Sequence, residues 1–114
     1  MDEIFESSIR SENDFAGVFE FDGEVSYFYL YQLDSENGNK VVGSIRVSVG
    51  PPYFNNEDIE LKWSPDEKMV ALYIANLLVC VFDCESRNKY GGDYKNGSSS
   101  TVPESIANYF SIKN

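Results

Sequence analysis

The clearest structural pattern in this chain is the stretch FAGVFEFDGEVSYFYLYQL, which covers residues 15–33. Large apolar side chains alternate with other residues over 15–21 and again over 25–33, and a two-residue period is typical of β-strands. Asp22-Gly23 separates the two runs and is a strong signal for a tight hairpin turn, because glycine adopts a positive φ without steric cost. The stretch therefore predicts an antiparallel β-hairpin.

The same alternation continues after this hairpin. In residues 41–49 we expect every second side chain to face the core, namely Val41, Gly43, Ile45, Val47 and Val49. Residues 59–63 alternate as well, and the following Ser64-Pro65-Asp66-Glu67 fits a type I turn. Residues 69–75 and 77–84 are nearly continuous apolar runs on either side of Asn76, which predicts a central hairpin buried on both faces.

The two ends of the chain have weaker patterns. Residues 2–13 are mostly polar, which leaves a short helix or an irregular arm as alternatives, and residues 85–101 are expected to form the longest loop. Thr101-Val102-Pro103-Glu104 fits a capping box, in which Thr101 and Glu104 satisfy free N–H groups at a helix start. The helix that follows carries Ile106, Tyr109 and Phe110, with Ile112 as a further candidate at helical spacing, and should dock on an open face or end of a sheet.

Together these patterns predict one domain over residues 1–114. Its fold is mainly β, with six or more antiparallel strands in meander order and one C-terminal helix, because short connections favour pairing of sequential strands. The expected architecture is a β-sandwich or a partly open barrel.

Charge narrows the class of partner. The chain has 19 acidic and 9 basic residues and a net charge of −10, and residues 1–36 hold ten acids against the single base Arg10. We expect these acids to form one patch near the first hairpin. Such a one-sided field favours a basic protein partner and disfavours nucleic acid, whose phosphates it would repel. No apolar run is long enough for a membrane helix, and residues 1–6 lack the basic start of a secretory signal, so we expect a cytoplasmic protein without a membrane partner.

Catalytic and metal chemistry find little support in the sequence. The chain has no histidine, the usual general base, and contains no phosphate-binding or nucleophile-elbow motif, so we expect no enzyme, no catalytic residues and no cofactor. Cys80 and Cys84 would lie on one face of a strand about 13 Å apart, too far for a disulfide. We interpret them as buried free thiols, because their spacing is not that of a metal site.

The stretch WSPDEKMVA, residues 63–71, resembles the strand-turn-strand motif of β-propeller blades, with Glu67 where that motif has glycine. The chain is too short to close a propeller, which needs four or more blades. The same hairpin resembles that of small uncharacterised bacterial domains, a likeness that implies no particular activity.

Tyrosines supply the candidate binding residues. Tyr27, Tyr29 and Tyr31 share one strand face and either pack under the helix or second sheet, or lie exposed beside acidic side chains as a binding surface. The segment 90–94 is a second candidate, either packed on itself or binding. The predicted partner-binding residues are Glu20, Asp22, Glu24, Tyr27, Tyr29, Tyr31, Tyr90, Asp93 and Tyr94.

In size, acidity and lack of a catalytic set, the chain is similar to small acidic bacterial immunity (antitoxin) proteins. That resemblance implies binding and neutralisation of a cognate basic toxin, such as a nuclease, by a monomer or weak dimer that offers carboxylates where phosphates would sit. Two alternatives remain open: a non-enzymatic binding or adaptor module, and a homo-oligomeric domain that pairs edge strands.

Overall fold

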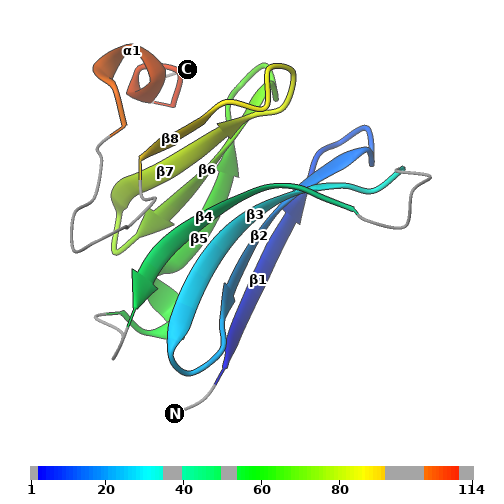
Figure 1. The fold of residues 1–114 in the computed structure, drawn as a ribbon. Helices are drawn as coiled ribbons and strands as arrows, with labels where there is room; N and C mark the ends of the chain where they lie inside the picture. The colour runs from blue at the N-terminus through cyan, green and yellow to red at the C-terminus, as the bar shows by residue number, and fades with distance from the viewer. Residues whose placement is uncertain (1–2, 35–39, 50–53, 92–101, 111–114) are drawn as a thin grey trace.

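A computed structural model describes residues 3–34, 40–49, 54–91 and 102–110. In these residues eight strands form two antiparallel sheets of four strands each, and the strand order in each sheet follows the chain. The two sheets pack face to face, and a short helix lies beyond the second sheet, on the side away from the first (Figure 1). The predicted mainly β fold is confirmed, as a sandwich of two open sheets.

The elements follow one another without crossovers. Sheet A contains β1 (Ile4–Ile9), β2 (Phe15–Phe21), β3 (Val25–Gln32) and β4 (Val41–Val49). Sheet B contains β5 (Ile59–Trp63), β6 (Met69–Ile74), β7 (Leu77–Asp83) and β8 (Lys89–Gly91). The 3-10 helix η1 (Asn56–Asp58) precedes β5, and the helix α1 (Glu104–Ala107) follows β8.

The main core lies between the inner faces of the two sheets. Its largest fully buried side chains include Phe19 and Phe28 from sheet A and Phe82 from sheet B, and the rings of Phe28 and Phe82 lie 5.1 Å apart. A glycine brings the sheets close at this point, because a Cβ on Gly43 would lie 2.7 Å from the Phe82 ring. A second inner-face glycine, Gly17, lies equally close to Val70. These small residues let the two sheets interlock at the density of a protein interior.

The outer face of sheet B has a second, smaller core. Met69, Ala71 and Val81 are buried there, and Ile106 and Phe110 of the α1 region pack against them together with other apolar side chains. The β6–β7 hairpin is therefore buried on both faces, and the C-terminal helix docks on an open sheet face, as the sequence predicts.

Residues 3–13, the described part of the predicted segment 2–13, form neither of the two predicted structures, because β1 is an edge strand paired along its length with β2. Strand pairing uses backbone groups, so it accepts a segment in which Ile4 is buried, Ser7 is exposed, and Glu6 and Ser8 are half-buried. The predicted loop 85–101 likewise contains the short strand β8, and its residues 92–101 lie outside the described part of the chain.

Two local predictions were wrong. Val41 does not face the core, because a bulge between Leu30 and Tyr31 shifts the register and places Val42 there instead. The helix cap is Pro103, which makes no side-chain cap hydrogen bond, and the predicted cap Thr101 lies outside the described residues. The short helix is therefore held mainly by apolar packing.

The type I turn at Ser64–Glu67 is present, with a hydrogen bond of 2.8 Å from the N–H of Glu67 to the carbonyl of Ser64. Glu67 has φ 57°, which explains why the propeller motif has glycine at this position. Among the described residues, no helix has the length and apolar character that crossing a membrane requires.

Candidate functional site

The outer face of sheet A carries the predicted tyrosine stripe. Tyr27 and Tyr29 stack with ring centroids 5.6 Å apart and an interplanar angle of 15°, and Tyr31 meets Tyr29 edge-on at 6.2 Å. All three side chains are half-buried. They pack neither under α1, which covers sheet B, nor between the sheets (Figure 1). The structure matches the second predicted arrangement in part, because no described element covers the stripe but its rings are only half-exposed.

Strand register arranges the outer face of sheet A in three rows. Across β1, β2, β3 and β4 these rows are Phe5–Glu20–Tyr27–Arg46, Ser7–Val18–Tyr29–Ser44 and Ile9–Ala16–Tyr31–Val41. The first row, next to the Asp22 turn, carries both charged side chains. The last row is apolar apart from the tyrosine hydroxyl, so the face grades from charged to apolar along the strands.

Exposure shows how this face is built where no described element covers it. Phe5 and Ile9 are 62% and 54% exposed, whereas Val18 and Ala16 beside the tyrosines are 5% and 2% exposed. Val18 and Ala16 belong to neither core cluster. Neighbouring side chains of the same sheet therefore shield them, and the larger side chains around them meet water.

Phe5 and Ile9 are functional candidates that the sequence analysis missed. The signal that points to them is the alternation of Phe5, Ser7 and Ile9, within a segment that its polar composition leads us to expect as a helix or an arm. Once β1 is a strand, these three side chains share a face with the tyrosines.

The Tyr29 hydroxyl remains a donor at neutral pH. Burial and the negative charge of Glu20 both raise the pKa of Tyr29 above its ordinary value, burial being the larger cause. A protonated phenol can donate to an acceptor on a partner while its ring supplies apolar contact.

The acidic residues beside the stripe have different roles. Glu20 and Glu24 are exposed, whereas the carboxylate of Asp22 accepts the N–H groups of Glu24 and Val25, each at 2.9 Å. The bonds from Val25 and Glu24, in that order, lower the pKa of Asp22. Asp22 therefore shapes the hairpin turn, and Glu20 and Glu24 are the carboxylates free to meet a partner.

The acids of the first third do not form the single predicted patch. Glu20, Asp22 and Glu24 lie at one end of sheet A, and Glu3, next to the start of β1, lies at the same end. Asp14 and Asp34 lie at the opposite end, where the N–H of Leu33 bonds the carbonyl of Asp14 at 2.8 Å. The prediction failed because acids in hairpin turns alternate between the two ends of a meander.

The second predicted segment lies elsewhere. Tyr90 belongs to β8 and packs against the core cluster on the outer face of sheet B, and Asp93 and Tyr94 lie outside the described residues. The structure therefore does not bring Tyr90 together with the Tyr27 stripe.

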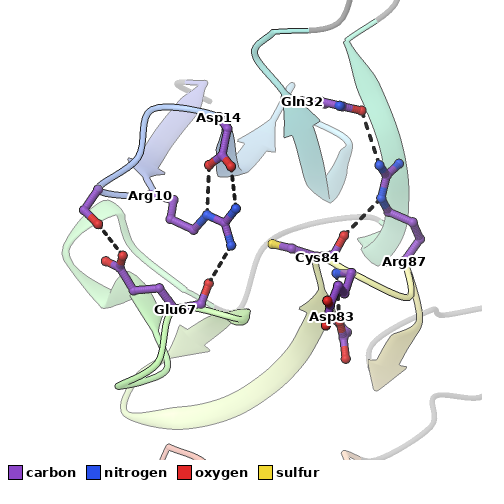
Figure 2. A network of polar contacts seen from close by, with 9 residues as sticks. Arg10, Asp14, Gln32, Glu67, Asp83, Cys84 and Arg87 are labelled. Carbon is purple, nitrogen blue, oxygen red and sulfur yellow. Dashed lines mark hydrogen bonds and ion pairs between the residues drawn. The ribbon is translucent and has the colours of Figure 1, made fainter.

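A network of polar contacts occupies the end of the sandwich farthest from the Asp22 turn (Figure 2). Arg10 donates from Nε to Asp14 at 2.8 Å, from Nη2 to the second oxygen of Asp14, and from Nη1 to the carbonyl of Glu67 at 3.1 Å. Nearby, Arg87 donates to the carbonyl of Cys84 at 3.1 Å and to Gln32 at 3.3 Å.

Both guanidinium groups lie over the ring of Phe15, at 5.1 Å for Arg10 and 5.4 Å for Arg87. The Asp14 side chain, chiefly through its hydrogen bond, raises the pKa of Arg10, and Arg10 in turn lowers that of Asp14. Arg10 bonds Asp14 of sheet A and Glu67 in a turn of sheet B, and Arg87 bonds Gln32 of sheet A and Cys84 in a turn of sheet B. Each arginine therefore joins one sheet to the other. The network therefore fastens the sandwich.

Two further features of the described residues carry groups capable of chemistry, namely the cysteines and a pocket lined by acids. Cys80 and Cys84 are buried free thiols in the main core, as predicted, and burial raises the pKa of Cys84 to about 11. A pocket of about 350 Å³ is lined by Glu57, Asp58 and Glu60, but the carboxylate of Asp58 already accepts the N–H of Asn55 at 2.8 Å. Within the described ranges no group of His, Cys, Asp or Glu side chains could hold a metal ion.

Comparison with known proteins places the chain in a family. Residues 2–101 match the family described as an uncharacterised protein conserved in bacteria, DUF2251. Neither a curated protein nor a solved structure matches the chain. The match covers most of the sequence and agrees with the resemblance to uncharacterised bacterial domains. The chain belongs to this bacterial family, DUF2251.

Proposed function

We propose that this protein is a non-enzymatic immunity protein that binds a basic toxin domain through the outer face of sheet A. The observation that carries the proposal is the ladder of Tyr27, Tyr29 and Tyr31, which is half-exposed on a face that no described element covers. A monomer gains little by presenting three adjacent aromatic rings to water. The same rings are well suited to a protein partner.

Tyrosine is favoured at protein interfaces because it offers a large, stiff contact surface with a polar tip. Stacking on Tyr29 holds each neighbouring ring in place before a partner arrives, which lowers the entropy cost of binding. Phe5 and Ile9 extend the same surface by two exposed apolar side chains. The face thus has the aromatic anchors expected of a binding site.

Charge supports a basic partner. The chain carries a net charge of −10, and Glu20 and Glu24 are exposed at the charged end of the face, next to Tyr27. Opposite charges speed association and select partners. A nuclease toxin has basic residues because it holds phosphates, and carboxylates can occupy the same positions. We therefore propose a partner that places cations near Glu20 and an apolar anchor near Tyr31.

The test is a pull-down experiment that compares three versions of the protein as bait. Wild-type protein, a variant with Tyr27, Tyr29 and Tyr31 all changed to serine, and a Tyr109→Ser control on the α1 side are each immobilised at low salt in lysate of the source bacterium. The wild type and control should capture one basic protein that the triple variant loses. About 1 M salt should release it, because the Debye length falls to about 3 Å. Expression of the captured protein alone should arrest bacterial growth. Co-expression of the immunity protein with it should restore growth.

Equal capture by the triple variant, or no basic protein on any bait, would contradict the proposal. A captured protein that does not arrest growth would replace the toxin with another basic partner and support an adaptor role. Circular dichroism of the triple variant checks its fold. A second variant, Glu20→Lys with Glu24→Lys, keeps the turn-forming Asp22 and should slow association at low salt only.

A further inference from the structure

The sandwich has four edge strands, and three of them are protected against pairing with another strand. β4 has two register shifts, and Lys89 donates to the outward carbonyl of Ser44 at 3.2 Å. β5 has five residues and exposes Glu60 and Lys62, and β8 has only three residues. Bulges, lysines, charges and short length are the usual means of blocking an edge. β1 has six residues and a regular register throughout.

The alternating hydrogen-bond pattern between β1 and β2 shows which backbone N–H and C=O groups of β1 point away from β2. The N–H of Arg10 bonds the carbonyl of Phe15 at 2.8 Å, so the hydrogen-bonded pairs farther along β1 involve Ser8, Glu6 and Ile4. The N–H and C=O groups of Phe5, Ser7 and Ile9 therefore point away from β2. Within the described residues these groups have no hydrogen-bond partner.

The side chains of the same three residues are also open. Ser7 is exposed, and Phe5 and Ile9 are two of the few large apolar side chains of the described chain that are more than half exposed. A free backbone edge and exposed apolar side chains at alternate positions are together the surface that accepts an additional strand.

We propose that β1 pairs antiparallel with β1 of a second copy of this chain, about a two-fold axis at Ser7. In this register Phe5 lies opposite Ile9 of the second copy and Glu6 lies opposite Ser8, so apolar side chains meet and carboxylates do not. Phe5, Ser7 and Ile9 of each copy then form about six hydrogen bonds with the other copy, two for each narrow pair.

Neighbouring registers are less favourable. An axis at Glu6 would place the two Glu6 carboxylates directly opposite each other, and like charges at that position destabilise a sheet. An axis at Ser8 would place Ile9 opposite Ser7 and leave Phe5 beyond the partner strand, opposite Ser11. The axis at Ser7 alone buries both exposed apolar side chains against each other.

The dimer would join the two A sheets into one sheet of eight strands. Because the two-fold axis of an antiparallel pair can stand perpendicular to the sheet, both tyrosine faces lie on the same side of the joined sheet and stay uncovered.

The contact made by a single six-residue strand is smaller than the roughly 1,200 Å² of a stable interface, so the dimer forms only at high protein concentration. Salt should strengthen it by screening the repulsion between two chains of charge −10, the opposite of its effect on a basic partner.

The test is sedimentation of the full chain over micromolar to millimolar concentrations, at low and high salt. Ser7→Pro removes an outward N–H without removing a bond to β2, so the fold should persist while the dissociation constant rises about tenfold or more. Ser44→Pro, on the opposite edge of sheet A, is the matched control and should keep the wild-type dimer.

A second variant does not depend on how the fold tolerates proline. Cysteine in Ser7→Cys would meet its counterpart across the axis with Cα atoms about 5.5 Å apart, within disulfide range, so oxidation should cross-link the dimer. Ser44→Cys should remain uncross-linked at the same concentration. A wild-type monomer throughout, with no cross-link in Ser7→Cys, overturns the proposal, as does a dimer unchanged by Ser7→Pro. The proposal is also overturned if the wild type is monomeric and captures a partner that Ser7→Pro does not capture, because the edge of β1 then binds that partner.

Discussion

The two sheets have the same four-stranded meander, but their outer faces differ in whether another element covers them. On sheet B the centre of the outer face buries Met69, Ala71 and Val81, with Tyr73 and Tyr90 packed beside them, and the α1 region covers it. On sheet A the outer face carries Tyr27, Tyr29 and Tyr31 and no described element covers it. The comparison teaches that two sheets of the same topology can differ in whether a further layer covers them, and that the covered face is the one with buried apolar side chains at its centre.

The three adjacent tyrosines of sheet A give a physical reason for the difference. A ring on sheet A shields its smaller neighbours, such as Val18 and Ala16, while its hydroxyl stays in contact with water. Met69, Ala71 and Val81 have no polar tip, so they would leave an apolar patch on sheet B without the α1 region, even with Tyr73 and Tyr90 beside them. A layer that shields itself remains available for binding, which is why we place the function on sheet A.

The largest expected effect comes from a matched pair of alanines. Ala71 and Ala16 are 0% and 2% exposed, each on the outer face of a central strand, but only Ala71 lies in the cluster that the α1 region covers. Ala71→Asp buries an unpaired charge and should lower the free energy of unfolding by about 3 kcal/mol or more. Ala16→Asp should cost about 1–2 kcal/mol, because nearby side chains can move aside and admit water.

Urea unfolding at neutral pH measures both variants. Equal losses for the two variants would contradict the idea that one face is sealed and the other open. Ala71→Ser and Ala16→Ser serve as controls for the change in side-chain volume, and both should cost less than the corresponding aspartates because a hydroxyl carries no charge.

The hairpin turns extend the comparison with a smaller effect. In sheet A the β2–β3 turn places Gly23 at φ 104°, whereas in sheet B the β6–β7 turn places Ala75 and Asn76 at φ 51° and 68°. Two positive φ values are the geometry of a type I′ turn, for which Asn-Gly is the best pair. Ala75→Asn with Asn76→Gly should therefore raise the free energy of unfolding by about 1 kcal/mol.

Thermal unfolding followed by circular dichroism measures this gain as a higher midpoint. Gly23→Ala is the complementary variant and should lower the midpoint, because alanine is strained at a positive φ. A midpoint that falls in the Asn-Gly variant would show that Ala75 or Asn76 makes a contact more important than its backbone strain.

Much of the fold could be predicted because its signals are local. The Asp22-Gly23 hairpin, the apolar runs of β6 and β7 and the buried thiols all follow from residue type and spacing. β1 could not be recognised, because an edge strand is held by backbone hydrogen bonds and tolerates polar side chains. The inward position of Val42 depends on a bulge, which alternation in a single strand does not reveal.

The candidate site was predicted in part for the same reason. Tyr27, Tyr29 and Tyr31 share a face by period alone, but whether that face is covered depends on where α1 docks, which is a tertiary property. Phe5 and Ile9 join the site only once β1 pairs with β2. The turn-forming role of Asp22 needs the positions of two N–H groups, although Asp before Gly already indicates a turn.

The smallest expected effect is a pH dependence that distinguishes the two sheets. Arg10 lowers the pKa of Asp14 at the end of sheet A, and Ser64 and the N–H of Lys68 lower that of Asp66 in the first turn of sheet B. A carboxyl group whose pKa is lower in the folded state contributes stability above its unfolded pKa, about 3.9, and loses it as the pH falls through the folded value.

The free energy of unfolding should therefore be level above about pH 5 and decline below about pH 4. Asp14→Asn should flatten this decline more than Asp66→Asn, because the partner of Asp14 is a charged guanidinium and that of Asp66 a neutral hydroxyl. Urea midpoints for both variants between about pH 2 and pH 7 measure the two slopes. Equal slopes in the two variants would mean that the ion pair of sheet A contributes no more than the neutral turn of sheet B. In that case Arg10 would fasten the sheets mainly through its contacts with the Phe15 ring and the Glu67 carbonyl.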